Sequence, residues 1–200
     1  FEPHFIAGID LGFNKPIQSK RFQERSYLDY QAGGFFGYNL TPVHGASLHM
    51  DINRVSMDMD CGYRQFNMIS AALAYRFNVL NALQGYVPDR RFDVSALVGP
   101  VVTLRKNAKK NIMMMEDNSE SEFLYEADPF EDEEFIGNQT QTGDNKIIVG
   151  GQFGIEATYN VNEEFGVFIK PQIRLYPSKI LPSEHVPGWR KIIACQIGAA

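Results

Sequence analysis

The stretch that decides the fold is KIIVGGQFGIEATYNVNEEFGVFIKPQIRLYP, which runs from Lys146 to Pro177. Apolar residues alternate with polar or small residues on both sides of the short segment NVNEE. Successive side chains of a β-strand point to opposite faces of the sheet, so this pattern predicts a β-hairpin with one apolar and one polar face. The apolar face of such a hairpin packs on the core of a soluble barrel, or it faces lipid in a membrane barrel.

The same alternation recurs along the chain, which has no long amphipathic helix. Eight segments show it, at about residues 5–13, 28–40, 46–54, 63–78, 92–104, 147–160, 165–176 and 189–200. The connections after the second and sixth segments are short, and NVLNALQGY after the fourth predicts a short helical turn. Apart from the short VSMDMDC, the connections at the opposite end are longer. This division of short turns and longer loops is typical of outer-membrane barrels.

Composition narrows the class of protein. Two hundred residues suit a single domain, which we expect to span 1–200 with a long acidic loop at about 105–145. A net charge of −5 argues against a nucleic-acid partner. Two cysteines form no disulfide framework. No stretch reaches the roughly 20 apolar residues of a membrane helix. The chain opens at FEPHF without Met, so we expect a mature or trimmed chain.

The polar face has the composition of a narrow barrel interior. Nine glycines lie on it: Gly8, Gly12, Gly33, Gly37, Gly99, Gly150, Gly154, Gly166 and Gly198. Small residues make room for long charged neighbours in a barrel of eight strands, whose interior just holds side chains. Enclosed charges need partners. We therefore expect an interior charge network of Asp10, Asp51, Arg64, Arg76, Asp93, Glu156, Lys170, Arg174 and Arg190.

The opposite face is nearly free of charge, and we expect it to face lipid. In the opening hairpin the lipid-facing residues are Ile147, Val149, Phe153, Ile155, Phe165, Val167, Ile169 and Ile173. Aromatic residues near the strand ends fit interfacial girdles. The predicted fold is all-β: an eight-stranded antiparallel up-and-down transmembrane β-barrel with a filled polar interior.

The central segment YRQFNMISAALAYRFNVLNALQGYVPDRRFDVSALVGPVV, residues 63–102, resembles the OmpA/OmpX-like family of outer-membrane β-barrels. The motif residues are Phe77-Asn78, Gly85-Tyr86, Pro88-Asp89-Arg90 and Gly99. The resemblance implies a porin-family eight-stranded barrel in the outer membrane of a Gram-negative bacterium. The aromatic residue that closes the last strand in this family is absent from QIGAA. Many relatives carry a peptidoglycan-binding domain, and nothing here matches one.

The connection at 105–145 is the candidate partner loop. It holds eleven of the 24 acidic residues of the chain, and apolar residues are interleaved with them. A disordered acidic loop would contain few aromatic residues. The segment is either a solvated surface loop or a docking segment. For docking, the candidate residues are Phe123, Tyr125, Phe130, Glu131, Asp132, Glu133, Glu134 and Phe135.

The sequence contains no motif for catalysis or metal binding. The four histidines have no ligand spacing, and no G-x-S-x-G motif occurs, so no catalytic residue, metal or cofactor is expected. The favoured function is a non-catalytic anchoring or interaction subunit of a larger outer-membrane complex. The expected partners are outer-membrane lipid and, through the loops, other outer-membrane proteins. The alternatives are a narrow pore and a soluble lipocalin-like carrier of an apolar ligand.

Overall fold

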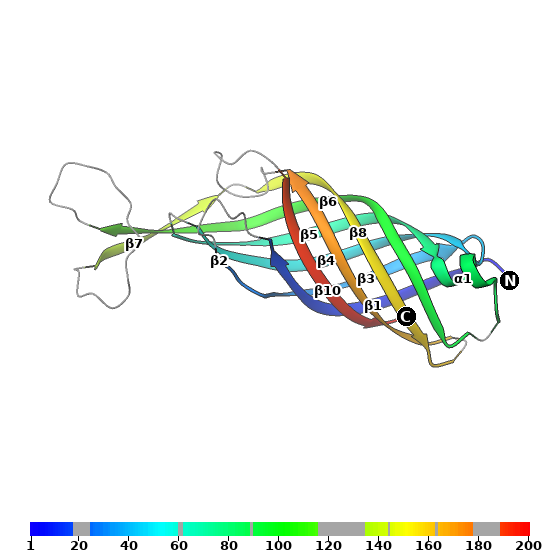
Figure 1. The fold of residues 1–200 in the computed structure, drawn as a ribbon. Coiled ribbons are helices and arrows are strands. Elements are labelled where there is room, and N and C mark those ends of the chain that lie inside the picture. Colours follow the sequence, from blue (N-terminus) through cyan, green and yellow to red (C-terminus); the bar gives the residue numbers. More distant parts are fainter. Residues whose placement is uncertain are drawn as a thin grey trace.

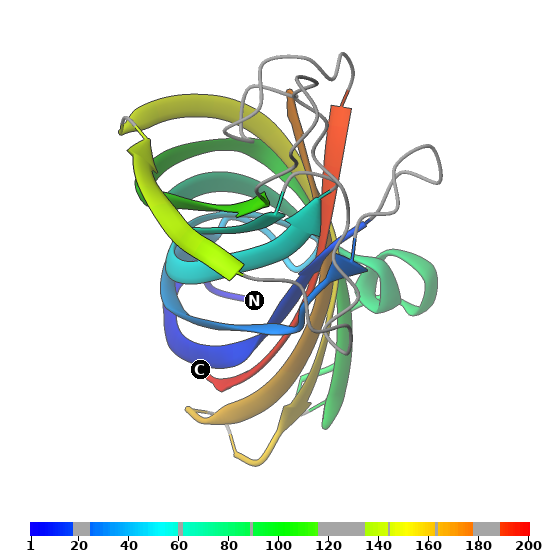
Figure 2. The same cartoon turned by 90° about the vertical axis from the view of Figure 1, so that its left-hand side faces the viewer.

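Eight long strands pair with their neighbours and close into a ring (Figures 1 and 2). The structure is a computed structural model that describes residues 1–17, 25–59, 62–88, 90–115, 135–143, 145–162, 164–177 and 189–200. The long strands are β1 (His4–Pro16), β3 (Asp29–Asn39), β4 (His44–Met59), β5 (Gly62–Asn78), β6 (Phe92–Met115), β8 (Lys146–Asn160), β9 (Gly166–Pro177) and β10 (Trp189–Ala199). The predicted fold class is therefore confirmed.

Two pairings make the sheet continuous. The first and last strands, β1 and β10, are antiparallel partners, with Ile9 opposite Ala199 and Pro16 opposite Ile192. The pairing of β4 with β5 completes the circuit. Each of the eight long strands is antiparallel to both of its neighbours. The short strand β2 (Arg25–Ser26) adds to β4 beyond β3.

Short turns gather at the end of the barrel that holds both termini (Figure 1). Between β3 and β4, Thr41 Oγ1 accepts hydrogen bonds from the amides of Val43 and His44. The predicted helical turn is confirmed as α1 (Val79–Gln84), which is capped by the side chain of Asn78. Gly85 follows α1 with φ of 78°, a backbone conformation that glycine adopts at low cost. The turns at this end of the barrel are thus stabilised by polar side chains that bind amides close to them in the sequence.

Side chains alternate between the lumen and the outside along the strands. On β9 the residues from Phe168 to Tyr176 at even positions are buried, and their odd-numbered neighbours are exposed. The lipid-facing set predicted from the opening hairpin lies on the outside: Ile147, Val149, Phe153, Ile155, Phe165, Val167, Ile169 and Ile173. The soluble-carrier alternative is wrong, because those residues would have to line its cavity. Among the described residues, no helix is both long and apolar enough to span a membrane.

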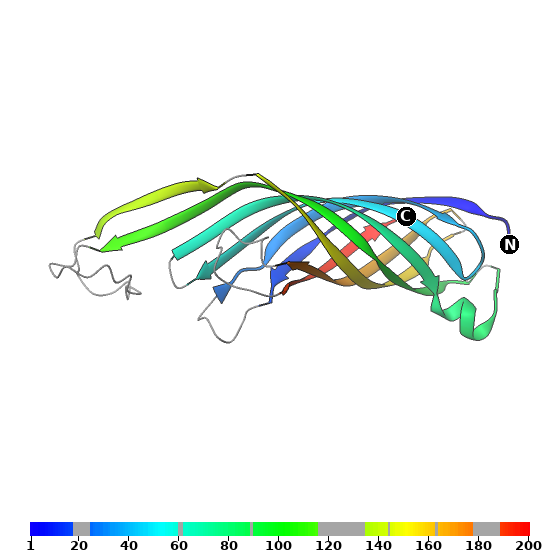
Figure 3. The same cartoon turned by 90° about the horizontal axis from the view of Figure 1, so that it is seen from above.

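Strand β6 differs from its prediction. The pattern placed its end near Leu104, but β6 continues to Met115 and pairs there with β7 (Phe135–Gly143). The pair forms a ribbon that projects beyond the other strands (Figure 3). The prediction was too short because it followed apolar alternation, which a strand needs only where one of its faces is buried or lies in lipid. We call β7 together with residues 107–115 of β6 the ribbon.

Glycines on the inner face allow close approach between neighbouring strands. A Cβ atom added at Gly99 of β6 would overlap the backbone carbonyl of Leu73 on β5. Backbone cannot yield as a flexible side chain can, so any larger residue must push the two strands apart. The outward-facing Gly151 of β8 differs, since an added Cβ there would meet nothing within 4 Å.

This contrast gives a stability prediction. Gly99→Ala should lower the free energy of unfolding by about 1–3 kcal/mol, the usual range for overpacking. The matched control Gly151→Ala should leave it nearly unchanged, because the added methyl group occupies open space. Urea unfolding in detergent, followed by the heat-modifiable shift of the folded band on a gel, measures both. Equal unfolding midpoints would contradict the packing argument.

Candidate functional site

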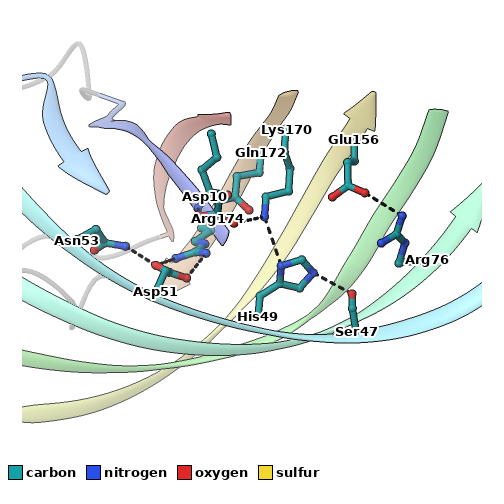
Figure 4. Close-up of polar contacts among 11 residues, drawn as sticks. Asp10, Ser47, His49, Asp51, Asn53, Arg76, Glu156, Lys170, Gln172 and Arg174 are labelled. Carbon is teal, nitrogen blue, oxygen red and sulfur yellow. Dashed lines mark hydrogen bonds and ion pairs between the residues drawn. The ribbon is translucent and has the colours of Figure 1, made fainter. Parts of the chain in front are cut away.

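The centre of the lumen holds a buried polar network (Figure 4). Lys170 of β9 donates to Asp10 of β1 over 3.0 Å, and its Nζ lies 3.3 Å from Nδ1 of His49 on β4. Nε2 of His49 lies 2.8 Å from the hydroxyl of Ser47. Gln196 of β10 donates to the second oxygen of Asp10 over 2.6 Å. These side chains are buried, so the network joins strands across the lumen without opening to water.

A second ion pair lies next to this network. The guanidinium of Arg174 donates to both oxygens of Asp51, over 2.7 and 2.6 Å. Asn53 donates to the same carboxylate over 2.7 Å. Bidentate pairing combines charge and geometry and is among the strongest side-chain interactions. Only 2 % of Arg174 and 4 % of Asp51 is exposed. The pair therefore links β9 to β4 inside the lumen.

Toward the end with the termini, a third pair joins β5 to β8. Arg76 donates to Glu156 over 2.8 Å. The other oxygen of Glu156 is buried and makes no hydrogen bond. Asp93 of β6 accepts from Asn78 over 3.1 Å and from Asn160 over 3.0 Å. The carboxylate of Asp93, a member of the predicted network, therefore accepts its hydrogen bonds from two amide side chains.

Two members of the predicted network remain, and the structure describes the side chain of only one of them. Arg190 of β10 is buried on the inner face. Arg64 belongs to β5, and its side chain lies outside the described residues. From the sequence, acids and bases could be matched only in number. The structure places the three predicted cations Arg76, Lys170 and Arg174 each against a different carboxylate.

Toward the end with the ribbon, buried apolar side chains form a cluster that the sequence did not lead us to expect. The apolar cluster consists of Val55, Met57, Phe66, Met68, Ala72, Val101, Ile148, Tyr176 and Ile192. Phe66 is 1 % exposed and Tyr176 is fully buried. A water-filled channel would leave the side chains that line it accessible. The buried cluster and the polar network therefore act as two successive barriers in the lumen.

The opposite end of the lumen is hollow. A cavity of 1230 Å³ lies there, with Arg76, Asp93, Glu156, Arg90 and Ala200 among its lining residues. We call this cavity the vestibule. It reaches inward as far as Phe35, whose ring stacks on His49 at a centroid distance of 5.2 Å. The vestibule thus ends at the polar network.

Two structural residues of the inner face escaped the sequence analysis. Phe35 was hidden by its polar and glycine neighbours, although it follows the inward parity of Gly33 and Gly37. Asn14 donates to backbone carbonyls of Tyr30 and Arg54 on two different strands. Continued alternation from Asp10 and Gly12 was the available signal for the inward orientation of Asn14.

The candidate partner loop falls mostly outside the described residues. Phe123, Tyr125, Phe130, Glu131, Asp132, Glu133 and Glu134 lie in the undescribed range 116–134. Phe135 begins β7, and only its backbone is described. Among the described residues, no group of three or more His, Cys, Asp or Glu side chains could hold a metal ion.

Comparisons with known proteins agree with the fold. No protein-family model matches the sequence, and no curated protein does. Among solved structures, Neisserial surface protein A is 12 % identical with a TM-score of 0.50, over 100 % of this chain and 99 % of that chain. The outer membrane protein OprG from Pseudomonas aeruginosa is 12 % identical with a TM-score of 0.49, over 96 % and 93 %. Likeness at the first of these scores supports a shared fold.

The buried pair of Arg174 and Asp51 yields a second prediction. Asp51→Asn should lower the free energy of unfolding by about 3–5 kcal/mol, because it leaves the guanidinium buried without a counter-charge. Replacing both partners, Asp51→Leu with Arg174→Met, should recover much of that loss. The exposed Lys146→Gln serves as control and should change stability by no more than about 0.5 kcal/mol. Urea unfolding in detergent measures all three, and a single variant as stable as the control would refute the assignment.

Proposed function

We propose that this eight-stranded outer-membrane β-barrel is a non-catalytic anchor that holds the ribbon and its connecting loop at the membrane surface for contact with other proteins. The observation that carries the proposal is the contrast between the two parts of the chain. The lumen is closed by buried side chains, whereas β6 and β7 extend far past the ring. The additional length of β6 and β7 therefore extends the protein beyond the barrel, where it can contact other proteins, and does not form a channel.

The length of β6 supports this interpretation. Its pairing with β8 ends at Arg105 opposite Lys146, and β6 continues from there to Met115. At about 3.3 Å per residue, the extension adds roughly 30 Å along the strand direction. Outer-membrane barrels have short turns on the periplasmic side and longer loops outside. By this rule, we propose that the ribbon lies on the cell exterior and that the termini lie in the periplasm.

The narrow pore is the second candidate, and one observation favours it. The vestibule already hollows the lumen at the end with the termini, as far inward as Phe35. Conduction would still require both the polar network and the apolar cluster to move. The anchor is favoured because the ion pair of Arg174 with Asp51 joins β9 to β4 on the opposite side of the ring and resists such movement.

Conductance separates the two candidates. Purified protein in planar lipid bilayers should give no stepwise current, because buried side chains close the lumen at two levels. A general porin, inserted under the same conditions, provides the positive control. Insertion of the test protein is verified by recovering it from the bilayer-forming vesicles. Reproducible current steps from the unaltered chain would favour the pore.

Excision of the ribbon tests the anchor directly. Residues 107–144 are replaced by Asn-Gly, so that a two-residue turn joins Lys106 to Asn145, the next antiparallel pair after Arg105 and Lys146. The barrel should insert and keep its heat-modifiable shift, because β6 keeps its pairing with β8 up to Arg105 and with β5 up to Lys106. In cells, photo-crosslinked protein adducts formed from residues 107–143 of the full chain should show a partner. Loss of barrel insertion on excision, or no adduct at any ribbon position, would overturn the proposal.

A further inference from the structure

The wall of the vestibule contains a carboxylate that no cation neutralises. Asp93 of β6 is half-buried there and accepts hydrogen bonds only from the side-chain amides of Asn78 and Asn160. Among the described residues, no Lys, Arg or His lies within ion-pair distance of Asp93. An ionised carboxylate has about four acceptor sites, so Asp93 can accept further donors from the vestibule.

A second acceptor lies on the neighbouring strand. Glu156 of β8 also lines the vestibule, and Arg76 binds only one of its two oxygens (Figure 4). The side chain is 2 % exposed, and its other oxygen is buried without a hydrogen bond, which is costly. The terminal torsion of a glutamate is soft, so a small rotation turns this oxygen toward the vestibule. A donor that enters the vestibule can therefore satisfy it.

Ser95 of β6 brings these two carboxylates together. It is the ladder partner of Glu156, and it is buried in the vestibule wall. Side chains of such partners have Cβ atoms about 5 Å apart. Asp93 lies two positions before Ser95 on the same strand, so it points to the same face about 7 Å away. We call Asp93, Ser95 and Glu156 the acceptor group, because all three present oxygen atoms to one region of the vestibule.

The charge in that region is not balanced. Of the three described arginines that line the vestibule, Arg76 is bound to Glu156. Arg90 donates to a backbone carbonyl of the preceding loop over 2.9 Å, and Arg91 is exposed. Both of them precede the first residue of β6 and lie nearer the mouth than Asp93. Two carboxylates and one guanidinium therefore leave one negative charge at the acceptor group.

Aromatic and apolar side chains line the mouth of the vestibule. The ring of Phe1 contacts the ring of Tyr86 edge to face at a centroid distance of 5.5 Å, and Val87 lies beside them in the lining. Phe1 precedes β1 and Tyr86 precedes β6, and these strands lie on opposite sides of the ring. The cavity of 1230 Å³ is large enough for a small organic molecule, whose sites measure roughly 300–1,000 Å³.

We propose that the vestibule binds an organic cation, a primary amine with an apolar or aromatic body. Its ammonium group carries three donors and donates to Asp93, to Ser95 and to the free oxygen of Glu156. Its apolar body lies against Phe1 and Tyr86 at the mouth. An ammonium group supplies both the missing positive charge and the missing donors, whereas an alcohol supplies only a donor. This binding site is independent of any role of the ribbon.

Fluorine NMR of a small amine tests the proposal. Full-length protein in phosphatidylcholine nanodiscs is titrated into para-fluorophenethylamine, and line broadening reports binding. The uncharged comparator is para-fluorophenethyl alcohol, which has a similar size and the same ring. Empty nanodiscs correct for partition of both probes into lipid. The amine should bind saturably and roughly tenfold or more tightly than the alcohol, because charge-assisted hydrogen bonds are stronger than neutral ones.

Two variants and a matched control locate the site. Asp93→Asn should weaken binding of the amine roughly tenfold, because it removes the unneutralised charge, and it should change binding of the alcohol little. Ser95→Ala keeps every charge and both amide bonds to Asp93, and it should weaken binding of the amine about threefold. Glu164→Gln removes a charge from the same cavity at an exposed position, where salt screens it, and should weaken binding by less than about twofold.

The heat-modifiable shift verifies that each variant is folded, and Ser95→Ala decides the matter if Asp93→Asn does not fold. Three results would overturn the proposal. The first is that the unaltered chain binds the amine no more tightly than the alcohol, so that the vestibule holds only water. The second is unchanged binding of the amine by the folded variants of Asp93 and Ser95. The third is an equal loss in Glu164→Gln, which would mean that only the total charge of the cavity matters.

Discussion

The ladder between β1 and β10 is the constraint on which the rest of the structure depends. In hydrocarbon an unpaired backbone amide or carbonyl costs several kcal/mol, so a membrane-spanning sheet can leave no open edge. The pairing of the first strand with the last, from Ile9 opposite Ala199 to Pro16 opposite Ile192, satisfies those groups. Closure after only eight strands then makes the lumen narrow. Every inward side chain has to fit in that space.

The glycines and the ion pairs are two consequences of this narrowness. Rings pack where glycines leave room: a Cβ atom added at Gly198 would come within 2.5 Å of the ring of Phe168. Charges are buried as pairs, because a lone charge in that space would be severely destabilising. Lys170 shows both effects, since it binds Asp10 and lies 5.6 Å from the ring centre of Phe168. Packing and charge pairing together keep the lumen closed at its centre.

The two ends of the barrel differ inside and outside, and the differences agree with one orientation. Inside, an apolar cluster lies toward the ribbon and a polar vestibule lies toward the termini. Outside, the described cations of the barrel strands lie toward the ribbon, whereas exposed aromatic rings lie toward both ends, with Phe13 and Tyr30 toward the ribbon and Phe5 and Phe36 toward the termini. Short turns, which outer-membrane barrels have on the periplasmic side, share the end with the termini (Figure 1). In the orientation that we propose, the ribbon lies outside the cell and the vestibule opens toward the periplasm.

Sequence alone determined the strands, their alternation and the face that lies inside, because a period of two is a local property of the chain. It also placed glycines and charged residues in the lumen, because they share one parity, but it missed Phe35, Asn14 and the apolar cluster. Tertiary structure decided which partners meet: Lys170 reaches Asp10 across 160 residues, and Ser95 of β6 lies opposite Glu156 of β8. The apolar cluster is equally non-local. Such contacts depend on the register and stagger of a closed ring, which no single segment encodes.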